Sequence, residues 1–203
     1  MALSNSSLHS ARRPLRAELR AKRRNVSPLD RAIAAQRVAR NVDRAFHLRA
    51  GKRVAIYAAM REELDTTPLI ELALKRGCRV FLPRIDRHTG HLDFHETHAD
   101  ARSSLNHLGI FEPEGTAAVS ARWLDLVLLP LVGFDDRGVR LGMGGGYYDR
   151  TFAFRNVHTA WRRPRLVGIA YAFQQLPSII DAAHDVRVDA VVTDKGVIRC
   201  RTG

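Results

Sequence analysis

The segment LDLVLLPLVGFDDRGVRLGMGGGYYD, from Leu124 to Asp149, decides the fold class more than any other part of the chain. Its apolar run from Leu124 to Val132 has the length and continuity of a strand that is covered on both faces. The following Asp135-Asp136-Arg137-Gly138 is typical of a turn. Four glycines then occupy the five positions from Gly142 to Gly146, and a helix can start near the last of them. This order predicts a buried strand, a glycine loop and a helix.

The glycine loop has the chemistry of a phosphate site. Glycines without a Cβ atom let the backbone approach a phosphate closely, and free amides at a helix start add positive partial charge. Arg140 can hold phosphate oxygens, and the carboxylate of Asp149 suits magnesium. The loop lacks the Lys-Ser/Thr pair of a Walker motif, and Tyr147 replaces the last glycine of a dinucleotide fingerprint. The pattern favours a nucleoside triphosphate, the alternative being a glycine-rich surface turn.

The rest of the chain alternates between helical and strand patterns. Pro14 is expected to open a first helix, and Ser27-Pro28 begins a second helix that ends by Gly51. A helix starts at Thr67-Pro68, and strands are expected at 54–58, 80–83, 91–95, 166–171, 189–193 and 197–199. We therefore predict an α/β fold, a Rossmann-like three-layer sandwich with a mainly parallel sheet, helices on both faces and an amino-terminal helical pair. Ligands of such folds gather at the carboxyl ends of the strands.

Composition indicates one domain. The chain has 203 residues, of which 45% are hydrophobic, enough for one substantial core. We expect residues 1–11 to be a flexible tail and residues 12–203 a single domain. No apolar stretch approaches the roughly 20 residues of a membrane helix, and the amino terminus lacks the pattern of a secretory signal. A cytoplasmic monomer that does not bind membranes is therefore expected.

We expect the cysteines and histidines outside the glycine loop not to bind a metal. Cys78 and Cys200 lack the paired spacing of a zinc site and are expected to be reduced bystanders. His91 and His95 would lie on the same side of an exposed strand, which makes a metal site geometrically possible. Their segment is polar and follows the turn residues Thr89-Gly90, so we favour a surface segment without metal.

Four segments carry a specific resemblance to a known family. They are RRPLRAELRAKRR (Arg12 to Arg24), VAIYAAMREELDT (Val54 to Thr66), LLPLVGFDDRGVRLGMGGGYYDRTF (Leu128 to Phe152) and HDVRVDAVVTD (His184 to Asp194). In these segments the chain resembles 5-formyltetrahydrofolate cyclo-ligases, also called 5,10-methenyltetrahydrofolate synthetases. The similarity covers about nine tenths of the chain in the family's order.

The resemblance implies an ATP-dependent reaction. ATP would phosphorylate the formyl oxygen of 5-formyltetrahydrofolate, the 10-amine would attack the activated carbon, and loss of phosphate would give 5,10-methenyltetrahydrofolate, with ADP and phosphate released. No protein nucleophile is needed. Another ATP-using ligase or kinase is the enzymatic alternative, and an RNA-binding protein is the non-enzymatic one.

The resemblance also assigns roles to residues. Arg140 and Tyr147 would be catalytic, and the carboxylate of Glu63 would recognise the pterin ring, with Glu62 as an alternative. Substrate contacts would come from Ala58, Met60, Glu63, Phe134 and Tyr147. ATP would be bound by Arg12, Arg16, Arg140, Leu141, Gly142, Met143, Gly144, Gly145, Gly146, Tyr147 and Tyr148. Magnesium would be held by Asp149 and Asp189. The chain departs from the family pattern at Arg12, where a lysine is frequent, and at Gly145, where eukaryotic members have a lysine.

Positive charge is concentrated at the amino terminus. Residues 1–53 hold 14 Lys and Arg against 3 Asp and Glu, whereas residues 54–203 hold 19 against 18. We interpret most of these cations as solvated faces of two amphipathic helices, and some as an electropositive wall that attracts ATP and the anionic, possibly polyglutamylated folate. A nucleic-acid surface is less favoured, because Phe46 is the only aromatic residue of this segment that could stack on a base.

Overall fold

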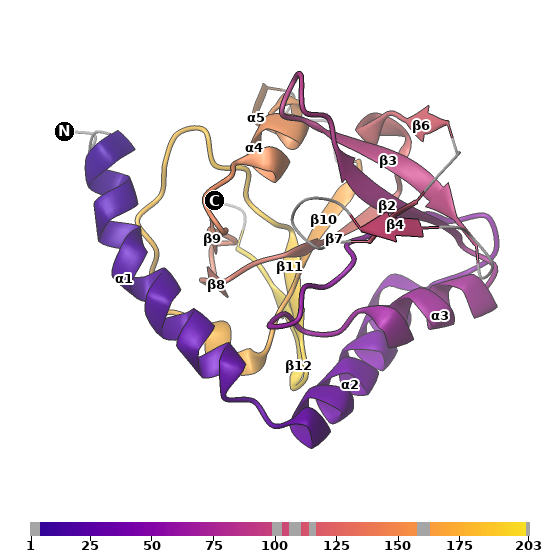
Figure 1. Ribbon diagram of the computed structural model, residues 1–203, viewed down its shortest axis with the longest axis horizontal. Coiled ribbons are helices and arrows are strands. Elements are labelled where there is room, and N and C mark those ends of the chain that lie inside the picture. The colour runs from indigo at the N-terminus through magenta and orange to yellow at the C-terminus, as the bar shows by residue number, and fades with distance from the viewer. Residues whose placement is uncertain (1–4, 99–102, 106–110, 114–116, 158–162, 202–203) are drawn as a thin grey trace.

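The structure is a computed structural model that describes residues 5–98, 103–105, 111–113, 117–157 and 163–201. Its centre is a mainly parallel sheet in the order β12-β11-β10-β7-β1-β2-β3-β6 (Figure 1). Five neighbouring strands run parallel, namely β1 (Arg53–Ile56), β2 (Arg79–Ile85), β7 (Leu126–Pro130), β10 (Arg165–Ile169) and β11 (Ala190–Thr193). Antiparallel pairing adds β3 (Leu92–Thr97), β6 (Ala118–Val119) and β12 (Gly196–Arg199) at the edges. The predicted α/β class is therefore confirmed.

Helices cover both faces of this sheet. On one face lie α2 (Pro28–Phe46) and α3 (Thr67–Lys75), and on the other lie α4 (Tyr147–Phe152) and α5 (Phe154–Val157) (Figure 1). Val38 and Val42 of α2 share a core with Ile56 of β1. Phe152 of α4 belongs to the core of the opposite face. Alternate side chains of each buried strand supply the two cores, as expected for a sheet covered on both sides.

The start of α2 follows its sequence signals. Ser27 has extended backbone and its Oγ accepts a hydrogen bond from the backbone N–H of Asp30 at 3.1 Å. Pro28 occupies the first helical position, where a missing N–H costs nothing. Capping chemistry of this kind is local, which explains why the sequence predicted the helix start correctly.

The first helix differs from the prediction. Helix α1 spans Asn5–Arg24, so Pro14 lies inside it and does not open it, and residues 5–11 of the predicted tail are helical. An interior proline is unfavourable because it removes one backbone hydrogen bond. Tertiary packing offsets this local preference, since the fully buried Leu19 packs in a third core against Val132, Val139, Leu141 and Ile179. None of the described helices has the length and apolar character needed to cross a membrane.

Two parts of the strand prediction are also corrected. The expected exposed strand at 91–95 corresponds to β3, which lies between β2 and β6 and buries His95 to 3% exposure. The segment expected to be irregular contains the paired strands β4 (Ser103–Leu105) and β5 (Phe111–Pro113). A short hairpin, β8 (Gly133–Phe134) and β9 (Arg140–Leu141), follows β7 and was not predicted. Its turn is fixed by the buried Asp135, whose Oδ1 accepts from the backbone N–H groups of Arg137 and Val139.

Candidate active site

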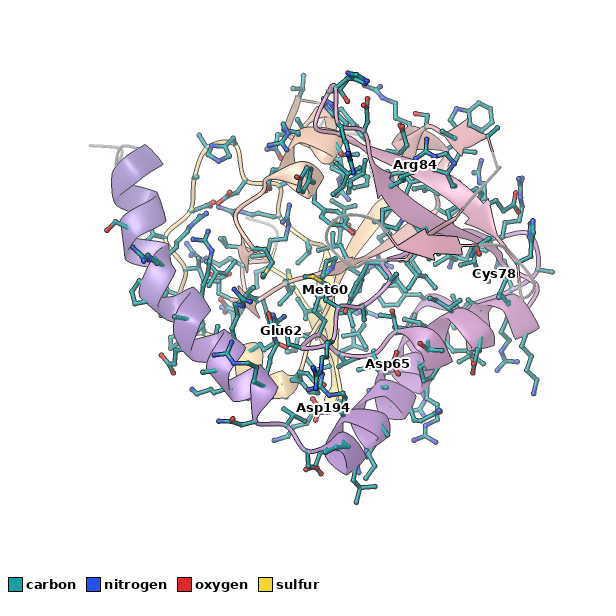
Figure 2. The ribbon with its side chains drawn as sticks, viewed as in Figure 1. Met60, Glu62, Asp65, Cys78, Arg84 and Asp194 are labelled. Carbon is teal, nitrogen blue, oxygen red and sulfur yellow. The ribbon has the colours of Figure 1, made fainter. Side chains whose placement is uncertain are left out.

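A cavity of about 380 Å³ lies at the carboxyl ends of β1, β2 and β7. The segments after these strands meet there with the glycine loop and with α1. In Figure 2 the labelled side chains of Met60 and Glu62 lie in the space between α1 and the sheet. A cleft beyond the carboxyl ends of parallel strands is the usual ligand site of such folds.

The glycine loop requires its glycines for different reasons. Gly144 and Gly146 have φ values of 107° and 67°, a region that residues with side chains rarely adopt. A Cβ atom at Gly145 would lie 2.6 Å from the ring of Tyr147, which is too close. Gly146 caps the start of α4, so the predicted helix start is confirmed. The loop therefore keeps an open backbone that faces the cavity.

Arg140 and Asp149 face each other across this loop. Nη2 of the buried Arg140 donates to Oδ1 of Asp149 at 2.7 Å, and its Nε donates to the carbonyl of Val186 at 3.2 Å. The same Oδ1 accepts from the backbone N–H of Val186 at 3.0 Å. These contacts hold the Arg140 guanidinium and the Asp149 carboxylate together at the cavity wall. An anionic ligand would compete with Asp149 for Arg140, and a metal ion would compete with Arg140 for Asp149.

Helix α1 supplies two further cations. Nε of Arg12 donates to the carbonyl of Ile180 at 3.0 Å, and its guanidinium forms an ion pair with Asp185. Nε of Arg16 donates to the carbonyl of Gly142 at 2.8 Å. Burial and the neighbouring Arg12 lower the pKa of Arg16 from its ordinary value, although an arginine remains charged at neutral pH. These two arginines line the cavity, where the charge of Arg12 is compensated by Asp185. Their role as an electropositive wall stays a prediction.

Glu63 and Glu62 point in different directions. Glu63 lines the cavity, is only 5% exposed, and its Oε2 accepts from the backbone N–H of Met60 at 3.0 Å. Burial raises the pKa of the Glu63 carboxyl, and the hydrogen bond from Met60 opposes this shift. Glu62 turns to α1 instead, where it accepts from Nε of Arg20 at 2.8 Å. The geometry therefore favours Glu63 over the alternative Glu62 as a ligand-binding carboxylate.

Three tyrosines also line the cavity, namely Tyr57, Tyr147 and Tyr148. Burial, followed by the charge of Glu63, raises the pKa of Tyr57 and of Tyr148, so both phenols stay neutral at physiological pH. Tyr148 also stacks on Phe152, with ring centroids 6.4 Å apart. The cavity is thus lined by phenol side chains as well as by cations, and the hydroxyl of Tyr57 donates to the carbonyl of Leu64.

Most of the predicted site residues meet in this cavity. The predicted residues that line it are Arg12, Arg16, Ala58, Met60, Glu63, Arg140, Gly142, Met143, Gly144, Gly145, Gly146, Tyr147, Tyr148 and Asp149. Lining residues that sequence reasoning missed are Tyr57, Pro83, Ile85, Leu92, Pro130, Leu131, Ala182, His184 and Asp185. Several of these residues lie at strand ends, a position that in this fold class indicates a ligand site. Asp185 stands in the carboxy-terminal segment that carried the family resemblance.

The side chains of Phe134 and Leu141 were predicted to contact the substrate and ATP, but they do not reach the cavity. Both are completely buried, and neither is among the residues that line the cavity. Phe134 belongs to the core that contains Phe152, and Leu141 packs in the core around Leu19. Successive residues of a strand point to opposite faces, so in β9 Arg140 reaches the cavity while Leu141 points to the core.

Asp189 is the third correction, because it does not reach the cavity. Its carboxylate forms two hydrogen bonds with Arg155, both of 2.8 Å, and accepts from the backbone N–H of Leu166 at 2.7 Å. It directly precedes β11, at the amino ends of the parallel strands, whereas the cavity lies at their carboxyl ends. The predicted joint metal site of Asp149 and Asp189 is therefore wrong.

The fold and the cavity define an α/β protein that binds its ligand beyond the carboxyl ends of parallel strands, with a glycine loop and arginines suited to phosphate. The model of the 5-formyltetrahydrofolate cyclo-ligase family matches residues 8–194, and the chain belongs to this family. It is therefore an enzyme of the ligase class.

Three similar proteins match over nearly their whole length. The 5-formyltetrahydrofolate cyclo-ligase of Mus musculus is 33% identical over 192 residues, covering 91% of this chain and 94% of the mouse protein. That of Escherichia coli K12 is 34% identical over 182 residues, covering 88% and 98%. The NMR structure of Aquifex aeolicus 5,10-methenyltetrahydrofolate synthetase matches with a TM-score of 0.79 and 32% identity, covering 95% of this chain and 94% of that one.

Proposed function

We propose that the protein converts 5-formyltetrahydrofolate to 5,10-methenyltetrahydrofolate with ATP, releasing ADP and phosphate. One observation carries this proposal: a single cavity joins a buried carboxylate suited to a pterin, Glu63, with a glycine loop and arginines suited to a triphosphate. Two cosubstrates that must exchange a phosphoryl group have to meet in one site.

The proposed reaction has two stages. The formyl oxygen attacks the γ-phosphorus of ATP, which forms an O–P bond and releases ADP. The 10-amine then attacks the activated formyl carbon, and the C–O bond breaks with release of phosphate, leaving the methenyl bridge. The amine proton passes to solvent or phosphate. The formyl oxygen therefore leaves in the phosphate.

The cationic wall would stabilise the transferring phosphoryl group. Arg140, Arg12 and Arg16 surround the glycine loop and supply positive charge where negative charge must be held. Arg140 is positioned before any ligand arrives, by Asp149 and the carbonyl of Val186. Such preorganised charge is the main catalytic contribution expected for phosphoryl transfer, because no covalent intermediate with the protein is needed.

The folate would bind where Glu63 lines the cavity. A carboxylate at Glu63 can accept two parallel hydrogen bonds, from the ring amide and the exocyclic amine of a pterin. Apolar side chains of Pro83, Ile85, Leu92 and Pro130 line the same cavity and suit the flat faces of the ring system. The contact with Glu63 would orient the formyl oxygen toward the nucleotide.

Magnesium would be held at this site with Asp185 in place of Asp189, and it would compete with the ion pairs of Asp149 with Arg140 and of Asp185 with Arg12. Asp149 and Asp185 both line the cavity, and magnesium in nucleotide sites commonly uses one or two carboxylates together with substrate phosphates. Within the described part of the chain no three His, Cys, Asp or Glu side chains form a metal-binding group, so the remaining ligands would be phosphate oxygens and water. Bound magnesium would neutralise phosphate charge. We propose these two carboxylates as its protein ligands.

A direct assay tests the proposed function. The purified protein is mixed with 5-formyltetrahydrofolate and magnesium-ATP, and the methenyl chromophore is followed together with ADP. We expect one ADP for each methenyl group formed, and no chromophore when ATP is omitted. ADP formation with folate present but without the chromophore would instead indicate another ATP-using ligase or kinase.

A further inference from the structure

The loop that carries Glu63 is tied together internally. This loop, residues 57–66, connects β1 to α3 and is called here the Glu63 loop. Oγ1 of Thr66 donates to the carbonyl of Tyr57 at 2.7 Å, and the hydroxyl of Tyr57 donates to the carbonyl of Leu64 at 3.3 Å. The backbone N–H of Glu63 donates to the carbonyl of Met60 at 2.8 Å. These contacts close the loop, and the buried side chains of Tyr57 and Leu64 anchor it in the core that it shares with α2 and α3.

Arg31 of α2 attaches the Glu63 loop to two helices. Its Nη1 donates to the carbonyl of Arg61 at 2.8 Å and to the carbonyl of Glu63 at 2.9 Å, on both sides of Glu62. Its Nη2 donates to the carbonyl of Arg23 in the last turn of α1 at 3.3 Å. One guanidinium therefore connects α1, α2 and the loop through backbone atoms, while Arg31 itself is absent from the cavity lining.

The loop is also attached through the side chain of Glu62. Glu62 pairs with Arg20 and Arg24, whose side chains are 41% and 56% exposed, and at 3.4 Å with Nη2 of the buried Arg23. The two exposed pairs contribute little because water screens them, so Arg23 provides the buried ion pair of Glu62. The bonds of Arg31 act on the carbonyls that flank Glu62, and one belongs to Glu63 itself. Because a guanidinium is planar and always charged, it can hold two carbonyls in one fixed geometry.

We propose that Arg31 is a positioning residue for folate binding, which sets the orientation of the Glu63 carboxylate from outside the cavity. The proposal rests on the proposed function, because it assigns Glu63 the recognition of the folate. It leads to a selective effect. Loss of the guanidinium displaces the Glu63 loop, whereas the glycine loop and Arg140 keep their own contacts. Folate binding is weakened and nucleotide binding is not.

The test compares Arg31→Met with Arg31→Lys, and with Arg37→Met as a control on the exposed side of the same helix. Removal of the two charged hydrogen bonds to the loop, together with the one to Arg23, is expected to raise the folate KM roughly tenfold in Arg31→Met, with ATP affinity measured without folate unchanged. Arg31→Lys, which keeps the charge and can reach one carbonyl, is expected to lie between Arg31→Met and the wild type. Arg37→Met should match the wild type.

A double-mutant cycle separates positioning from general damage. Each Arg31 variant is also made together with Glu63→Gln, and the folate KM is measured in both backgrounds. If Arg31 acts through Glu63, its substitution raises the KM much less when Glu63 is already Gln. Equal effects in both backgrounds, or no rise in KM in either Arg31 variant, would overturn the proposal. The proposed function would still stand in that case, because it depends only on turnover by the wild-type protein.

Discussion

Replacing Glu63 by glutamine isolates the charge of this side chain. The change keeps the shape, and the amide oxygen can still accept the hydrogen bond from the backbone N–H of Met60. One of the two carboxylate acceptors becomes an NH₂ donor, which opposes the donors of a pterin. The glycine loop, Arg140 and Arg16 make none of their contacts through Glu63.

The expected magnitude follows from the burial of the site. Glu63 is only 5% exposed, and a hydrogen-bonded carboxylate at such a site should contribute about 1.5 to 3 kcal/mol to folate binding. This corresponds to roughly a ten- to hundredfold rise in the folate KM. If Glu63 also aligns the formyl oxygen, kcat falls as well, because the contact is then stronger in the transition state.

The same substitution should leave stability intact or increase it. Burial raises the pKa of Glu63, so the folded state favours the neutral carboxyl. The stability contributed by this group is therefore complete at acidic pH and is lost as the pH rises through the raised pKa. Glu63→Gln removes a buried carboxyl whose ionisation is disfavoured by burial, and it is expected to have a Tm at least equal to that of the wild type. Folate affinity of the wild type should weaken as the pH falls through the same pKa.

Separate titrations of folate and ATP measure these effects. Steady-state turnover gives the folate KM and kcat, and nucleotide binding without folate gives the ATP affinity. The exposed Glu71→Gln in α3 is the charge-matched control and should match the wild type. A large folate defect in Glu62→Gln with a normal Glu63→Gln would transfer the role to Glu62. An equal loss of ATP and folate affinity in Glu63→Gln would refute the assignment of Glu63 to the folate alone.

Three further substitutions test other parts of the site. Asp149→Asn should reduce turnover strongly and make it more dependent on added magnesium, and an unchanged magnesium titration would remove Asp149 from the site. Gly144→Val should lose ATP binding, because φ is 107° at this position, and wild-type ATP binding would contradict the role of the loop. Asp189→Asn should lower the free energy of unfolding by about 1 to 3 kcal/mol through its lost contacts with Arg155, while a shifted magnesium dependence would restore Asp189 as a ligand.

Local sequence signals account for the parts of the fold that were predicted. The apolar run before the glycine loop, the cap at Ser27 and the turn at 135–138 depend on neighbouring residues alone. The gathering of Glu63 and the glycine loop then follows from topology, because parallel strands place their carboxyl ends at one edge. The start of α1 could not be predicted in this way, because packing around Leu19 outweighs the local effect of Pro14.

The errors within the site have a common physical origin. Phe134 and Leu141 belong to the two short strands of a hairpin, each two residues long, and a strand reverses the direction of its side chains at every residue. Asp185 and Asp189 are four residues apart, a separation that extended chain can bridge over about 13 Å. One faces the cavity and the other lies at the opposite end of the strands. A sequence motif does not show which of these two carboxylates faces the cavity, whereas the contacts of each carboxylate in the structure do.

The fate of the formyl oxygen tests the central claim most directly. The protein is supplied with 5-formyltetrahydrofolate that carries ¹⁸O in the formyl group and with unlabelled magnesium-ATP in unlabelled water. Phosphorylation of the formyl oxygen in the cavity predicts that each methenyl product is accompanied by one phosphate containing one ¹⁸O atom. Release of unlabelled phosphate, with the label appearing in water, would show that ATP does not activate the formyl group and would contradict the account.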